Sequence, residues 1–212
     1  MEEKKLTEQE SLALIAEMIQ KTKKRIGLDC GTPMLLWGYT TVITAVLVHI
    51  ALLLTQSHKA MLLWMLIPIV GWLLNLRFVK GEKRSGGEAK SYTDIITDRM
   101  WLFTTLSELI ALALCAGFAA FGYCVWIIMF IYSLMAVGAA STAQGIIIRE
   151  NSLVAGGFVG IAGGLVVMGC KIGGIPLNAT WAMPLFIGCF ALMTILPGHL
   201  INRKAHRLCS KS

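Results

Sequence analysis

The chain has 212 residues and a net charge of +7; 56% of its residues are hydrophobic and 15% are charged. Soluble domains are typically about 45–50% apolar and about 25% charged. The composition therefore excludes a disordered chain, a disulfide-stapled secreted domain, a coiled coil and an ordinary water-soluble enzyme, and it predicts a multi-pass membrane protein.

The first 33 residues are expected to form a cytoplasmic amphipathic helix beside the membrane. Thr7 and Glu10 have the spacing of a capping box, and Gly27 is expected to end the helix. Between these positions apolar residues recur at the spacing of one helical face. These residues are Leu12, Ile15, Met18, Ile19 and Ile26.

Two functional interpretations of this helix stay open. The helix either lies on the inner membrane surface with its basic end against anionic lipid headgroups, or it docks on a partner protein or on a second copy of the chain. The structural alternative is that the helix only leads into the first span and fixes the topology of the chain. The basic residues that would face the lipid are Lys21, Lys23, Lys24 and Arg25.

Six apolar runs follow, and each has about the length a helix needs to cross about 30 Å of hydrocarbon. The nearly uninterrupted apolar stretch 45–54 favours helices over the alternating strands of a membrane barrel. We therefore predict an all-α bundle of six transmembrane helices in three hairpins. The six runs are residues 34–55, 60–78, 100–121, 123–143, 152–168 and 181–201.

The distribution of Lys and Arg predicts that both termini are cytoplasmic. In this orientation seventeen cations lie on inner segments, including the loop 79–99 and the basic tail 202–212, and the outer turns hold Lys59 and Lys171. Such an asymmetry is a strong positive-inside signal. The positive net charge then faces anionic lipid, and we expect no nucleic-acid partner.

Glu108 is the one acidic or basic residue deep within a predicted span. A charge there costs about 2.5–3.5 kcal/mol on insertion scales, so the side chain should face the bundle interior and have polar partners. We expect it to be protonated, because no Lys, Arg or His lies at its depth. The polar residues at a similar depth are Thr41, Thr44, Thr104, Tyr132, Ser133 and Thr194.

This layer has two interpretations. It is either a binding site for a substrate, proton or cation, or a neutral Glu108 that makes one interhelical hydrogen bond. Such bonds contribute about 0.6–2 kcal/mol and specify how helices pack.

The fifth run carries glycines at four-residue spacing, at Gly156, Gly160 and Gly164. Small residues at this spacing let two helices approach closely. We expect them to serve helix packing within the chain, with a homodimer seam or a substrate-lining face as the alternatives.

The sequence contains no motif that predicts an enzyme. It has neither H-E-x-x-H nor G-x-S-x-G, and its six cysteines show no C-x-x-C or Cys/His metal spacing. We expect no catalytic residues, no metal site and no cofactor.

The run Leu12-x-Leu14-Ile15-x-x-Met18-Ile19, together with Leu35-Leu36-Trp37-Gly38 at the start of the first span, resembles a group of small uncharacterised bacterial membrane proteins with six helices. The resemblance covers about the first 40 residues. It implies a location in the bacterial inner membrane and no particular activity.

The sequence thus predicts a membrane-embedded assembly or regulatory module that acts through partner or lipid contacts of its N-terminal helix. The alternative is a transporter of small solutes or ions that uses the polar layer around Glu108.

Overall fold

The computed structural model describes residues 8–82, 92–123 and 125–209, with side chains from residue 31 onward except at 58, 75, 78–82 and 208–209. This part of the chain contains no strand, which confirms the all-α class. The elements are α1 (Glu8–Thr55), η1 (His58–Met65), α2 (Leu66–Glu82), α3 (Tyr92–Ala120), α4 (Trp126–Ile148), α5 (Asn151–Ile172), α6 (Ala179–Phe190), η2 (Ala191–Ile195) and α7 (Leu196–Cys209).

In the described part of the chain, five helical segments are long and apolar enough to cross a membrane, as expected for a multi-pass membrane protein. They are Gly31–Thr55, Tyr92–Ala120, Trp126–Ile148, Asn151–Ile172 and Ala179–Arg207.

The expected run 60–78 is divided between η1, a 3-10 helix, and the 17-residue α2. Pro68, the third residue of α2, has no N–H to bond the carbonyl of residue 64, and its ring crowds that carbonyl. The α-helix therefore begins beside Pro68, and the turns before it are of the tighter 3-10 type.

The expected helix end at Gly27 is wrong, because α1 runs without a break from Glu8 to Thr55. At 1.5 Å per residue its length is about 72 Å. Gly31 has a packing role instead of a terminating one, since a Cβ there would collide with the Asn202 amide of α7. Pro33 also lies inside the helix without ending it.

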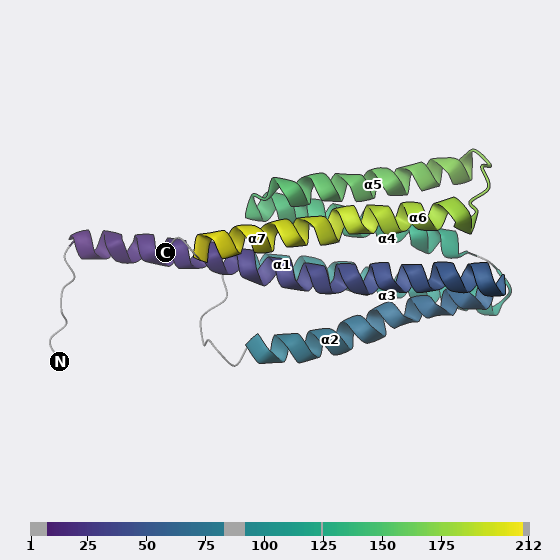
Figure 1. The fold of residues 1–212 in the computed structure, drawn as a ribbon, viewed down its shortest axis with the longest axis horizontal. Coiled ribbons are helices and arrows are strands. Elements are labelled where there is room, and N and C mark those ends of the chain that lie inside the picture. The colour runs from purple at the N-terminus through teal and green to yellow at the C-terminus, as the bar shows by residue number, and fades with distance from the viewer. Residues whose placement is uncertain (1–7, 83–91, 124, 210–212) are drawn as a thin grey trace.

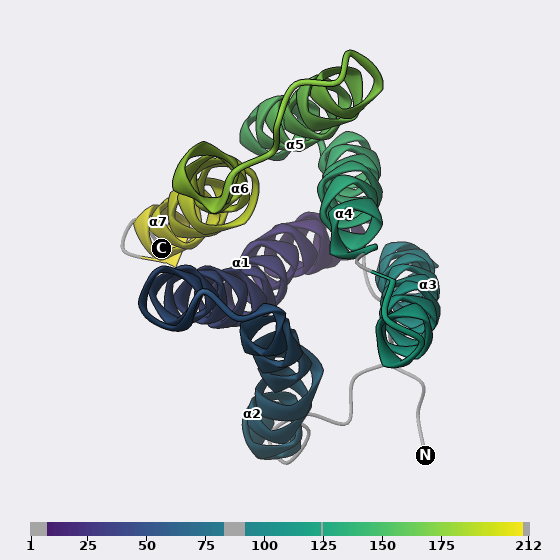
Figure 2. The same cartoon turned by 90° about the vertical axis from the view of Figure 1, so that its right-hand side faces the viewer.

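Two helix pairs form the centre of the bundle: α4 packs on α5, and α1 packs on α6, η2 and α7. The view along the bundle shows α2 and α3 at its periphery, α2 beside α1 and α3 beside α4 (Figure 2). In the side view the first turns of α1 extend well beyond the end of α7 (Figure 1). The closest packing therefore joins helices from different expected hairpins.

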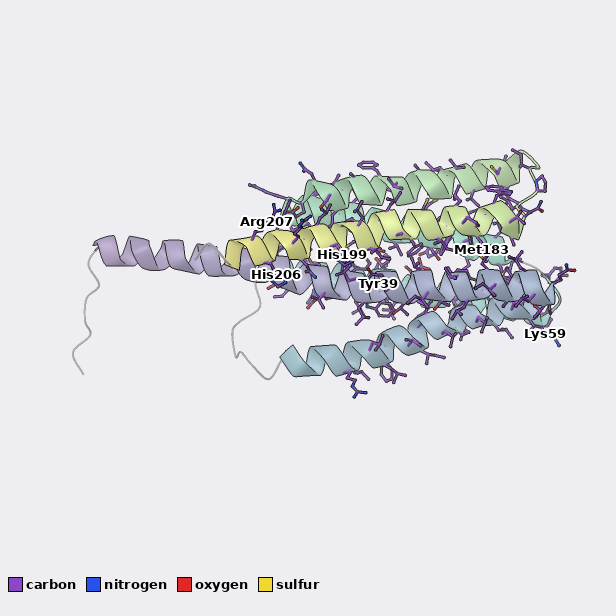
Figure 3. All side chains as sticks on the ribbon, viewed as in Figure 1. Tyr39, Lys59, Met183, His199, His206 and Arg207 are labelled. Carbon is purple, nitrogen blue, oxygen red and sulfur yellow. The ribbon has the colours of Figure 1, made fainter. Side chains whose placement is uncertain are left out.

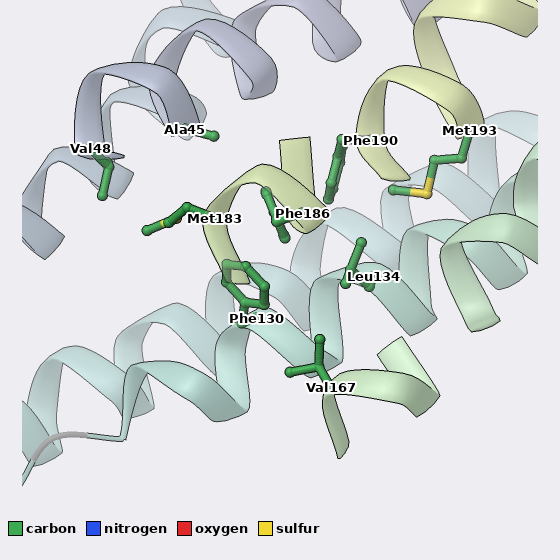
Figure 4. Packing of buried hydrophobic residues seen from close by; sticks show 9 residues of the cluster. All are labelled: Ala45, Val48, Phe130, Leu134, Val167, Met183, Phe186, Phe190 and Met193. Carbon is green, nitrogen blue, oxygen red and sulfur yellow. The ribbon is translucent and has the colours of Figure 1, made fainter. Parts of the chain in front are cut away.

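The main apolar core lies where α6 meets α1, α4 and α5 (Figure 4). Phe186 is its centre: its ring centroid lies 4.3 Å from that of Phe130 and 4.5 Å from that of Phe190. Met193 of η2 is fully buried beside them. η2 is a π-helical turn, and it lets one continuous helix contact both α1 and α5.

The turn between α4 and α5 holds Arg149 in the left-handed region, with φ 57° and ψ 42°. This conformation is unfavourable for a residue with a Cβ, and glycine adopts it freely. We expect Arg149→Gly to raise the free energy of unfolding by up to about 1 kcal/mol, because relief of about 1–2 kcal/mol of left-handed strain outweighs glycine's entropy cost of about 0.5–1 kcal/mol. Arg149→Ala is the matched control, because it removes the same charge and keeps the strain. Equal stability of the two variants in a reversible unfolding assay would contradict the expectation.

Candidate functional site

A polar seam joins α3 to α4, the helix on which α3 packs. The Trp101 indole N–H donates to Gln144 Oε1 at 2.9 Å, and Ser133 Oγ lies 3.0 Å from Glu108 Oε2. On α3 the two bonded residues are seven positions apart, so they lie two turns apart on one face. The seam thus fixes both the rotation and the axial position of α3.

The hydroxyl group of Ser133 contacts two oxygen atoms, one of which is Glu108 Oε2. Ser133 Oγ also lies 2.8 Å from the carbonyl oxygen of Met129. A serine hydroxyl has one proton, and a carbonyl oxygen only accepts. Both contacts are hydrogen bonds at once when Ser133 donates to Met129 and a protonated Glu108 donates to Ser133. A neutral Glu108 therefore satisfies both contacts, and its protonation stays a prediction.

The second carboxyl oxygen of the same residue is in a different situation. Glu108 Oε1 is buried and has no hydrogen-bond partner among the described residues. An acceptor in this position can receive a proton donor from a bound molecule, from water or from a neighbouring hydroxyl group. A Glu108–Ser133 pair with a purely structural role would not need this unpartnered oxygen.

Glu108 forms no hydrogen bond with the other members of the expected polar layer, all of which the structure describes. The Thr104 hydroxyl donates to the carbonyl of Met100 on its own helix at 3.0 Å. Thr194 donates to the carbonyl of Phe190 at 2.6 Å, also on its own helix.

Thr194 lies against Gly38, so it belongs to the contact between α1 and η2. Thr41 and Thr44 are buried on α1, which packs on α6, η2 and α7. Of the expected layer, Ser133 is the member that the structure joins to Glu108 by a hydrogen bond.

Two apolar hollows, each of about 510 Å³, flank a ridge of α4 formed by Ile128 and Tyr132. One lies against α3, where Ser107 and Leu114 contribute to its wall, and the other lies against Met168 of α5. Tyr132 therefore lines surface hollows, and Glu108 is in the wall of neither. The predominantly apolar walls suit lipid or apolar side chains better than a hydrated solute.

Gly156, Gly160 and Gly164 of α5 face other helices of the same chain. A Cβ at Gly156 would lie 2.9 Å from the carbonyl oxygen of Leu192 in η2. One at Gly160 would meet the Met193 sulfur and the backbone of α4, and one at Gly164 would meet Met135 of α4. The backbones of α4, α5 and η2 approach closely at these positions.

Sequence reasoning missed Gln144, which is 4% exposed and accepts the bond from Trp101. The expected fourth span ends at residue 143, one position before Gln144. An amide one residue beyond a span, facing a tryptophan of the preceding span, is the signal that could have found it.

The side chains of Lys21, Lys23, Lys24 and Arg25 lie outside the described side chains, although the backbone that carries them belongs to α1. Among the described residues no group of three His, Cys, Asp or Glu side chains is arranged to hold a metal ion. No protein-family model matches the chain, and neither a curated protein nor a solved structure matches it.

Proposed function

We propose that the chain is a six-span protein of the bacterial inner membrane, with both termini cytoplasmic, and that it works as a non-enzymatic assembly module. The excess of Lys and Arg on one side supports the orientation. A sixth crossing is supported by the combined length of η1 and α2, which is about 40 Å at 2.0 and 1.5 Å per residue.

The unbroken helix α1 is the observation that carries the proposed function. Residues 8–30 precede the candidate span Gly31–Thr55 within the same helix, and we call them the arm. The arm is about 35 Å long, and its first turns stand beyond the end of α7 (Figure 1). A helix that continues the direction of a membrane span leads away from the bilayer.

This direction favours protein docking over the lipid-surface interpretation. A helix that lies in the headgroup layer must bend where it leaves its span, and α1 has no break at Gly27 or Pro33. The apolar residues Leu12, Ile15 and Ile19 share one face of the arm by their spacing. We infer that this face enters an apolar groove of a partner protein, as amphipathic helices do in helix-in-groove recognition.

A pair of double variants tests the arm. We expect Leu12→Glu with Ile19→Glu to abolish partner binding, because two carboxylates would enter an apolar interface. Ala13→Glu with Gln20→Glu is the matched control: it adds the same two charges, again seven residues apart, on another side of the helix. The measurement is photo-cross-linking in the membrane from position 15, with mass-spectrometric identification of the cross-linked protein.

The expected result is one reproducible cross-linked protein in the wild type and the control, and none in the first variant. Cross-links that persist in both double variants would contradict the docking face. Loss in both would indicate that added charge, and not the apolar face, is responsible, and it would equally contradict the proposal.

Transport through the layer around Glu108 is the second candidate function. The unpartnered Glu108 Oε1 favours it. The apolar hollows beside α4, whose walls do not include Glu108, favour the assembly module instead.

A further inference from the structure

A strip of polar side chains lies on the outer face of the α1–α7 pair, towards the end of α7. Tyr39 Oη and His199 Nε2 are 2.8 Å apart, with the two rings edge to face at 5.9 Å. Arg203 lies four residues after His199 on α7, and His206 lies three residues after Arg203. The three residues therefore lie on one side of the helix. All of these side chains are exposed, and Figure 3 shows Tyr39, His199 and His206 along this helix pair.

The register of the two helices adds a residue of α1 to the strip. α1 and α7 run in opposite directions, and Tyr39 is level with His199. Thr32, two turns before Tyr39, is therefore level with His206, two turns after His199. Thr32 is exposed. We call Thr32, Tyr39, His199, Arg203 and His206 the α1–α7 strip.

The same surface becomes apolar towards the middle of the bundle. Ile43 follows Tyr39 by one turn on α1 and is 57% exposed. Leu192 and Leu196 precede His199 and are 47% and 50% exposed. Hydrogen-bond donors and a cation at one end, continued by exposed apolar side chains, match the headgroup and chains of one lipid molecule.

The carboxylate of Glu150 in the α4–α5 turn is bound by Lys204, and not by a residue of the strip. Glu150 accepts a hydrogen bond from Lys204 Nζ at 2.6 Å, and Lys204 lies about 100° around the helix from Arg203. An anion is therefore the complementary partner for Arg203, whose guanidinium forms paired hydrogen bonds with phosphate oxygens.

We propose that the α1–α7 strip binds the phosphate headgroup of an anionic diacyl phospholipid, with the acyl chains against Ile43, Leu192 and Leu196. Arg203 binds the phosphate, while Tyr39, His199, His206 and Thr32 supply further donors. Basic sites between membrane helices on the cytoplasmic side bind anionic headgroups in this way. The strip is separate from the arm, so failure of this proposal leaves the docking proposal intact.

The test measures lipid binding to the purified full-length chain in detergent. Phosphatidylglycerol and phosphatidylcholine with the same acyl chains are titrated, and bound lipid is counted by native mass spectrometry. The wild type should prefer phosphatidylglycerol. Arg203→Gln should weaken that binding at least about tenfold, because a hydrogen bond to a charged group is lost. Lys204→Gln, which removes the same charge one residue away, should leave it unchanged.

Two further measurements complete the experiment. Tyr39→Phe removes a single hydroxyl, so it should weaken lipid binding severalfold. It replaces Arg203→Gln as the test variant if Arg203→Gln does not fold. Glycerophosphoglycerol and inorganic phosphate, which have no acyl chains, should not displace the lipid. Displacement by either, equal binding of both lipids, or equal weakening by Arg203→Gln and Lys204→Gln would overturn the proposal.

Discussion

Gly138→Ala is expected to lower the free energy of unfolding by about 1–3 kcal/mol, the range for overpacking a close-packed contact. A Cβ at Gly138 would lie 2.8 Å from the carbonyl oxygen of Gly157 and 2.9 Å from the backbone nitrogen of Ile161. Both atoms belong to the backbone of α5, so no side-chain rotation relieves the collision. The whole of α5 must move away from α4, and this loosens the closest helix pair of the bundle.

Gly117→Ala on α3 and Gly169→Ala on α5 are the matched controls. A Cβ at either position meets nothing within 4 Å. Alanine is also the better helix former by about 1 kcal/mol in water, so the controls should be as stable as the wild type or more so. Unfolding in mixed micelles, followed by tryptophan fluorescence, measures the difference. If Gly138→Ala behaves like Gly169→Ala, the close approach of α4 and α5 is contradicted.

Glu108→Leu is expected to cost about 0.6–2 kcal/mol, because it removes the interhelical bond to Ser133. Glu108→Gln should cost far less. The glutamine amide N–H can donate to Ser133 Oγ as a protonated carboxyl does, while Ser133 continues to donate to Met129. The measurement is the same unfolding assay, extended with Ser133→Ala to give a double-mutant cycle.

The cycle separates the bond from other effects of each substitution. A coupling free energy near zero between positions 108 and 133 would contradict the hydrogen bond. Equal losses for Glu108→Gln and Glu108→Leu would contradict the protonated carboxyl, because the amide then fails to replace it. A Glu108→Gln variant that is stable and yet inactive in a proton-coupled transport assay would support the transport candidate over the assembly module.

The continuity of α1 shows how a local signal can mislead. Gly27, Gly31 and Pro33 fall within seven residues, and glycine or proline commonly marks the end of a helix. Gly31 instead makes room for Asn202 of α7, a residue 171 positions away in the chain. Sequence alone gives no means of distinguishing a glycine that ends a helix from one that receives a neighbouring helix.

The candidate site was predicted in part for a similar reason. Counting residues along each span gives depth, and depth correctly placed Ser133 near Glu108. It does not give the rotation of each helix about its axis. Thr194 has a similar expected depth, but it faces its own backbone and Gly38.

The sequence by itself determined the all-α class and the long apolar helices, because a chain this apolar must satisfy its backbone polar groups within each segment. It also singled out Glu108, whose Oε1 atom is buried in the structure. The tertiary structure alone decided that α4 packs on α5, that the arm continues the first span, and that Gln144 bonds to α3. Hydropathy is the transfer free energy of each residue taken separately. Helix pairing, by contrast, depends on close packing and hydrogen bonds between distant segments.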